Sequence, residues 1–103
     1  MIHVIATIEL NPGTRELFLA EFRKLVPQVR AEAGCIEYGP AIDVPCGAAA
    51  QPPVRENVVV VVEKWADLAA LDAHSKAPHM DAYRPRVKDF VKTVTLHVLK
   101  PVE

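Results

Sequence analysis

The chain has 103 residues, of which half are hydrophobic and about a quarter charged, and its formal net charge is −1. Such a composition is typical of one globular domain, here residues 1–103, and excludes a disordered or strongly basic nucleic-acid-binding chain. The longest apolar run, the valines 58–62, is too short to span a membrane, and residues 1–10 lack the pattern of a signal peptide. We therefore expect a cytoplasmic protein without nucleic-acid or membrane partners.

Metal and cofactor motifs are absent from the sequence. Cys35 and Cys46 lie eleven residues apart and form no CxxC pair, so a zinc site is not indicated and both are expected to be free thiols. The sequence also contains no GxGxxG, P-loop or GxSxG motif. We expect neither a bound cofactor nor a metal.

The first half of the chain predicts a strand, a helix and a second strand. Apolar and polar residues alternate over 2–10, and a buried helical stripe follows, formed by Phe18, Phe22, Leu25 and Val29. Gly34 can adopt the left-handed conformation that ends such a helix. Residues 35–44 read as the second strand, and 45–54, with three prolines and no charge, as a long irregular loop.

The second half predicts a strand, two helices and a final strand. The valines of the strand expected at 55–65 do not alternate with polar residues, which indicates burial on both faces. Asp67 is a good N-cap and Pro78 a good first residue for the two helices, and residues 93–99 alternate again. The order β-α-β-β-α-β indicates an α+β, ferredoxin-like fold, an antiparallel sheet with helices on one face. A second copy of the chain is the simplest cover for the other face, so we expect a homodimer.

A candidate site lies between residues 63 and 83. This stretch contains the only tryptophan, Trp65, together with His74, His79 and Tyr83. The expected helix starts bring these aromatic and titratable side chains to one strand-to-helix corner. Glu63 is interpreted as structural, facing an oppositely charged residue across the strands or in the dimer. A two-histidine metal site from His3 and His97 is rejected because it lacks further ligands.

Three segments, GCIEY (34–38), VVEKW (61–65) and ALDAHSKAPHMDAY (70–83), resemble the antibiotic biosynthesis monooxygenase family, particularly its small quinol monooxygenases. The resemblance extends from about Ile2 to Leu99. It implies a dimer whose two sheets pack face to face into an α/β barrel. It also implies oxidation of an electron-rich aromatic substrate, such as a hydroquinol or anthrone, by O2 without flavin, haem or metal.

Such chemistry requires a dry pocket, a base and groups that stabilise an anion. We expect His74, Trp65 and Tyr83 to be catalytic, with His74 as base or hydrogen-bond partner and Trp65 lining the pocket. The expected substrate-binding residues are His79, Arg55, Asn57 and Tyr38. Each has an ordinary structural alternative: Trp65 and Tyr83 as core residues, His74 as a helix C-cap and His79 as a solvent-facing residue.

Two other functions stay open. Haem-degrading enzymes share the fold and the strand tryptophan, but their pattern has an asparagine early in the first strand, where this chain reads VIATIE. A non-oxidative relative, either an isomerase of a small carbonyl compound or a binding module, would contain the same histidines. The sequence does not separate a base that serves O2 chemistry from a base that serves enolisation.

Overall fold

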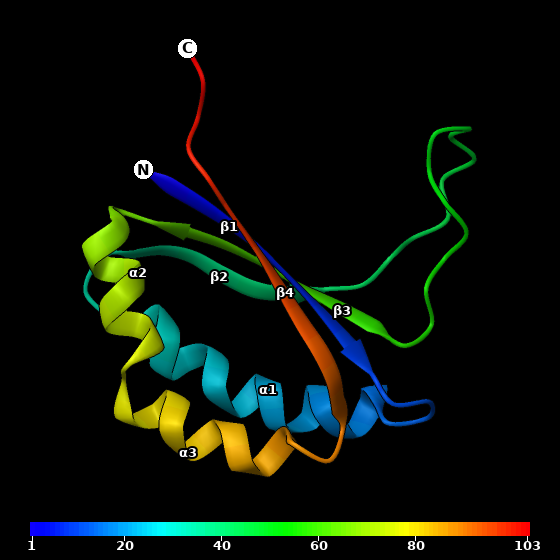
Figure 1. Ribbon diagram of the computed structural model, residues 1–103, viewed down its shortest axis with the longest axis horizontal. Coiled ribbons are helices and arrows are strands. Elements are labelled where there is room, and N and C mark those ends of the chain that lie inside the picture. The colour runs from blue at the N-terminus through cyan, green and yellow to red at the C-terminus, as the bar shows by residue number, and fades with distance from the viewer.

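The computed structural model describes residues 1–103 and contains four strands and three helices (Figure 1). In chain order these are β1 (Ile2–Leu10), α1 (Arg15–Arg30), β2 (Cys35–Ala41), β3 (Val58–Trp65), α2 (Leu68–Ser75), α3 (Pro78–Val87) and β4 (Val91–Leu99). The expected α+β, ferredoxin-like arrangement is confirmed, including the division of its second helical segment into α2 and α3.

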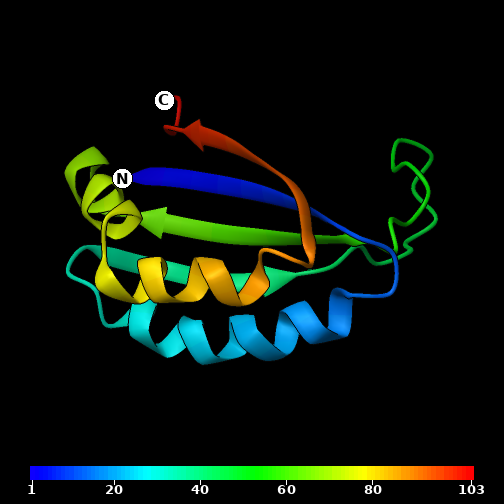
Figure 2. The same cartoon turned by 60° about the horizontal axis from the view of Figure 1, so that its bottom comes forward.

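The four strands form one antiparallel sheet in the order β2-β3-β1-β4. Helices α1 and α3 lie together along one face, and α2 lies at the end of the sheet where β3 ends (Figure 2). The opposite face carries no helix. No helix of the structure has both the length and the apolar character needed to cross a membrane.

The core lies between the sheet and the two long helices. The predicted stripe of α1 is confirmed, because Phe18, Phe22, Leu25 and Val29 are all at most 1% exposed. Trp65, at the end of β3, is also completely buried. Burial of these large apolar groups is the main stabilising contribution to such a domain.

Strand β3 departs from its expected burial and length. Val59, Val61 and Trp65 are fully buried on the helix-facing side, whereas Val60 and Val62 on the opposite face are only half-buried. Within one chain no element covers the open face, so burial of both faces depends on the second copy that the sequence predicts. Strands β2 and β3 are also shorter than expected, since β2 ends at Ala41 and β3 begins at Val58.

The corner between β3 and α2 is fixed by a cap and a glycine. Asp67 is the N-cap of α2, and its Oδ1 accepts a hydrogen bond from the backbone N–H of Ala70 at 2.8 Å. Gly34 has φ +84°, and a Cβ there would lie 2.6 Å from the Cβ of Ala70. Glycine at this position therefore permits both the left-handed turn and the close approach of α2.

Residues 42–57, between β2 and β3, form an irregular segment that includes the expected loop 45–54. The segment projects away from the sheet and helices (Figure 1). Its two ends are joined by the guanidinium of Arg55, which donates to both carboxylate oxygens of Asp43 at 2.8 and 2.9 Å. The Arg55 hydrogen bonds hold the pKa of Asp43 at about 2.

Candidate active site

A cavity of about 760 Å³ lies between the helix-facing side of the sheet and helices α2 and α3. This volume is within the usual range for small-molecule sites. Most of its lining is hydrophobic. The apolar lining includes Val4, Ala6, Ile8, Phe22, Val61, Leu68, Leu71, Met80, Val87, Val91, Val94 and Leu96. Such a lining suits a flat aromatic molecule, although Leu68, Val94 and Leu96 are more than half exposed and leave the cavity open to solvent on one side.

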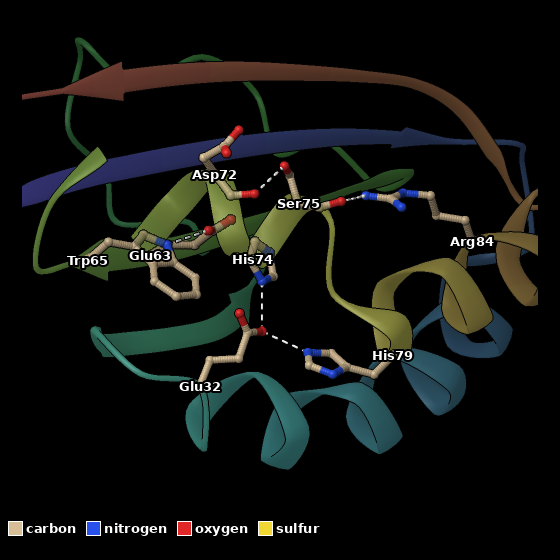
Figure 3. Close-up of polar contacts among 8 residues, drawn as sticks. All are labelled: Glu32, Glu63, Trp65, Asp72, His74, Ser75, His79 and Arg84. Atoms are coloured by element: carbon tan, nitrogen blue, oxygen red, sulfur yellow. Dashed lines mark hydrogen bonds and ion pairs between the residues drawn. The ribbon is translucent and has the colours of Figure 1, made fainter. Parts of the chain in front are cut away.

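The carboxylate of Glu32 joins two histidines beside this cavity. Its Oε2 atom lies 2.9 Å from Nδ1 of His74 and 2.7 Å from Nε2 of His79 (Figure 3). Glu32 follows α1, His74 lies in the last turn of α2, and His79 is the second residue of α3. Because an ionised carboxylate only accepts hydrogen bonds, both ring nitrogens act as N–H donors toward it.

His74 presents its second ring nitrogen to the cavity. Its side chain is 7% exposed and packs against Trp65 and Tyr38, with ring centroids 4.7 and 5.5 Å away. Nε2 has no hydrogen-bond partner within the protein. Every fully buried side-chain nitrogen or oxygen of the protein has such a partner, so Nε2 is not fully buried. Nε2 therefore keeps access to the cavity that His74 lines. With the proton on Nδ1, Nε2 carries a lone pair and can act as a base.

Glu63 is a second polar group of the cavity wall. It lies on β3, is 5% exposed, and its Oε1 accepts the indole N–H of Trp65 at 2.9 Å (Figure 3). Burial raises the pKa of this carboxyl, while the Trp65 hydrogen bond and the nearby His74 partly oppose the increase. The expected cross-strand partner of opposite charge is not found, because Val4 and Tyr38 lie opposite Glu63.

Two tyrosine hydroxyls complete the polar groups. Tyr38 on β2 and Tyr83 on α3 are both largely buried and line the cavity. Burial raises the pKa of each phenol well above its ordinary value, so both stay protonated near neutral pH. Neither hydroxyl has a hydrogen-bond partner within the protein. Because every fully buried side-chain oxygen has one, both hydroxyls remain accessible from the cavity. They can donate hydrogen bonds to an oxygen of a bound molecule.

The structure brings His74, Tyr83 and Tyr38 together but corrects the positions expected for Trp65 and His79. Trp65 has no exposure and does not line the cavity, because its ring is covered by His74 and Tyr38 and its N–H is taken by Glu63. His79 contacts Glu32 but does not line the cavity either.

Arg55 and Asn57 are not part of this site. They precede β3, whereas Trp65 is its last residue, and at about 3.3 Å per residue the two strand ends lie roughly 20 Å apart. Both line a separate polar hollow with Glu9 and Thr93. The guanidinium of Arg55 is occupied by Asp43, so the expectation that these two residues hold an oxyanion in the main cavity is wrong.

The same three side chains could hold a metal ion. One ligand atom each from Glu32, His74 and His79 lies within 4.8 Å of the others. Two histidines and one carboxylate are also the ligands of non-haem iron oxygenases. The two N–O separations of 2.9 and 2.7 Å equal those of ordinary charge-assisted hydrogen bonds. Hydrogen bonding alone therefore explains the arrangement.

Sequence reasoning missed Glu32 and gave Glu63 no functional role. Glu32 is 42 residues from His74, and no local pattern marks a contact over that separation. A signal for Glu63 was available, because a residue two positions before Trp65 shares its face of the strand. A carboxylate on the face that carries a buried tryptophan indicates a buried acid.

The fold and the cavity define an α+β protein with a ligand-sized apolar site on the helical side of its sheet. The family model of antibiotic biosynthesis monooxygenases matches residues 1–86, and the chain belongs to this family. The chain is 38% identical over 103 residues to a protein of Escherichia coli K12 named "Probable quinol monooxygenase YgiN", with 98% of both chains covered.

Solved structures share the fold of this chain. The crystal structure of PA3566 from Pseudomonas aeruginosa superimposes with a TM-score of 0.82 at 28% identity, covering 99% of this chain and 94% of the other. The structure of Rv0793 from Mycobacterium tuberculosis gives a TM-score of 0.78 at 27% identity, with 99% and 95% covered. The protein described here is a monooxygenase of this family.

Proposed function

We propose that this monooxygenase oxidises an electron-rich aromatic, such as a hydroquinol or an anthrone, with O2 and without flavin, haem or metal. The observation that carries the proposal is the unpartnered Nε2 of His74, which opens into a mainly hydrophobic cavity while Glu32 binds its Nδ1. The name of the Escherichia coli relative supports a quinol as substrate.

The chemistry needs a substrate that supplies its own electrons. His74 Nε2 accepts the proton of a ring hydroxyl and leaves a phenolate, which can transfer an electron to O2. For a hydroquinol the complete reaction consumes one O2 and yields a hydroxyquinone and water, so one oxygen atom enters the ring. Tyr38 and Tyr83 donate hydrogen bonds that stabilise the negative charge as it develops.

The mainly apolar lining of the cavity serves the same reaction. Water would solvate the phenolate and weaken each hydrogen bond that Tyr38, Tyr83 and His74 make to the substrate. Glu32 holds His74 in one tautomer, which keeps the lone pair on the nitrogen that faces the substrate. In this proposal His79 is the second donor to Glu32 and does not contact substrate.

We further propose that the functional unit is a homodimer. The helix-free face of the sheet carries Ile5, Val60 and Val62, all half-buried within one chain. On β4, Leu99 pairs with His3, which puts it on this same face, and it is 47% exposed. An apolar surface of this kind is typical of a face that packs against another protein. A second copy covering it would form the barrel expected for the family.

An oxygen electrode with a panel of quinols and anthrones tests the proposed activity. We expect O2 uptake above the autoxidation blank, and we expect it to persist after exhaustive chelation. Loss of uptake on chelation, with recovery on adding one divalent metal, would instead assign Glu32, His74 and His79 as metal ligands. No uptake with any substrate of the panel would reject the oxidative proposal.

A second candidate function is isomerisation of a small carbonyl compound. It is favoured by two accessible proton acceptors in one cavity, His74 Nε2 and the free oxygen of Glu63, an arrangement that also suits enolisation. Turnover of a hydroxyketone without O2 consumption would support this candidate.

A further inference from the structure

Glu63 is a buried carboxyl with no cationic partner. It lies on the helix-facing side of β3 between Val61 and Trp65, and none of the ion pairs of the structure involves it. Burial of a carboxylate without a positive partner is energetically costly. Buried, unpaired acids in cavities are therefore candidates for a functional role.

The two oxygens of this carboxyl have different surroundings. Oε1 accepts the indole N–H of Trp65 at 2.9 Å (Figure 3). Oε2 has no partner within the protein, and because no fully buried side-chain oxygen lacks one, it retains access to the cavity. Trp65 therefore fixes the carboxyl in one orientation and leaves one oxygen available to a bound molecule.

We propose that Glu63 is a catalytic residue that accepts a hydroxyl proton from the substrate, and that Trp65 is the positioning residue that orients its carboxylate. The inference rests on the proposed function, and it favours a substrate with two ionisable hydroxyl groups. A hydroquinol loses both hydroxyl protons when it becomes a quinone, and the cavity offers two acceptors, His74 and Glu63. In the Glu63 step, the substrate O–H bond breaks and a Glu63 O–H bond forms. The electron pair stays on the substrate oxygen.

Several titratable groups surround Glu63 and influence its protonation. Those facing it are Tyr38 and Cys35 from β2, His74 from α2, and Glu32 between α1 and β2, while the opposite residue of β1 is the apolar Val4. Burial is the largest influence and raises the pKa of Glu63, and Glu32 adds to the increase. The carboxyl thus becomes a stronger proton acceptor than an exposed glutamate.

The test is Glu63→Gln, which keeps the size of the side chain and an oxygen for the Trp65 N–H but cannot accept a proton. We expect kcat for a hydroquinol to fall by about 10²–10⁴-fold with a much smaller change in KM. The acidic limb of the pH–kcat profile should change, because the component that Glu63 contributes is lost while that of the second base stays. Glu37→Gln is the matched control, because Glu37 is an exposed glutamate on β2 that does not line the cavity. This variant should retain the wild-type kcat and the wild-type pH profile.

The single tryptophan gives a readout that does not depend on turnover. Trp65 emission should change with pH in the wild type as Glu63 titrates, and this change should be absent from Glu63→Gln. Trp65→Phe removes the hydrogen bond that lowers the Glu63 pKa, so the acidic limb of kcat should move to higher pH. A merely structural Trp65 would lower the melting temperature without moving that limb.

Wild-type kcat and an unchanged pH profile in Glu63→Gln would overturn the proposal. If Glu63→Gln does not fold, Glu63→Asp is the second variant. It retains a carboxylate and should keep an acidic limb at reduced kcat, and loss of the limb would overturn the proposal.

If the wild type takes up no O2, the proposed function fails, but the role of Glu63 can still be tested. The test is then anaerobic binding of a hydroquinol, measured by Trp65 emission. Binding that depends on pH in the wild type but not in Glu63→Gln would support it as a substrate contact, and identical profiles would contradict it.

Discussion

Nδ1 of His74 lies 2.9 Å from Oε2 of Glu32, although 42 residues separate them in the chain. The pair connects the end of α1 to the end of α2 and directs the other nitrogen of the imidazole into the cavity. Carboxylate–histidine pairs of this kind fix the tautomer of the ring.

If Glu32 acts only through His74, the effects of changing both will not add. We expect His74→Ala to lower turnover by about 10²–10⁴-fold, and Glu32→Gln to lower it by a smaller factor. The double variant should be no slower than His74→Ala alone. The measurement is the turnover rate of each variant after circular dichroism has shown that the variant is folded, with Glu37→Gln as control. Losses that multiply in the double variant would show that Glu32 has a separate role.

Glu63 should make stability depend on pH. Burial raises its pKa in the folded protein, so the folded state holds more protons than the unfolded state between the two pKa values. The contribution of neutral Glu63 is complete below the unfolded pKa of about 4.3 and is lost as pH rises through the folded pKa. Glu63→Gln stays neutral, so its melting temperature should exceed that of the wild type increasingly across this window. A difference that does not vary with pH would contradict the prediction.

Gly34 should tolerate no side chain. Gly34→Ala places a methyl group 2.6 Å from the Cβ of Ala70 and strains a backbone with φ +84°. We expect a loss of about 1–3 kcal/mol in stability and reduced activity, because α2 carries His74. Gly13→Ala is a matched control, since its φ is +80° and nothing lies within 4 Å of the added carbon. Equal melting temperatures for the two variants would show that contact with α2 is unimportant.

The open face of the sheet should form the contact between two copies. Sedimentation at micromolar concentration should give twice the chain mass for the wild type, and one chain mass for folded Val62→Glu, which places a charge on that face. Leu17→Glu on α1, where Leu17 is 56% exposed, is the control and should stay dimeric. A single-chain mass for the wild type would contradict the homodimer.

Local sequence patterns predicted most of the fold. The Phe18 and Phe22 stripe, the Asp67 cap and Pro78 at the start of α3 are each determined by neighbours within a few residues. The polar contacts of the site depend on distant segments. The Glu32–His74 pair requires knowing how α1 and α2 end relative to each other, which no periodicity encodes.

The sequence predicts wrongly where the position of a strand end or the orientation of a ring decides the site. It predicts one site for Arg55, Asn57 and Trp65, although Arg55 and Asn57 lie at the opposite end of β3 from Trp65. The composition around Trp65 indicated an aromatic near a site, but not which side of its ring would face the cavity. That side is set by Glu63 and His74, which occupy its N–H and one face.

Isotopically labelled O2 tests the central claim most directly. With a hydroquinol substrate, purified and chelated protein should produce a hydroxyquinone that contains one labelled oxygen atom, and His74→Ala should produce it at a rate close to the uncatalysed blank. Mass spectrometry of the product reads the incorporation. An unlabelled product, or a hydroxyketone isomerised with no O2 consumed, would contradict a monooxygenase mechanism in this cavity.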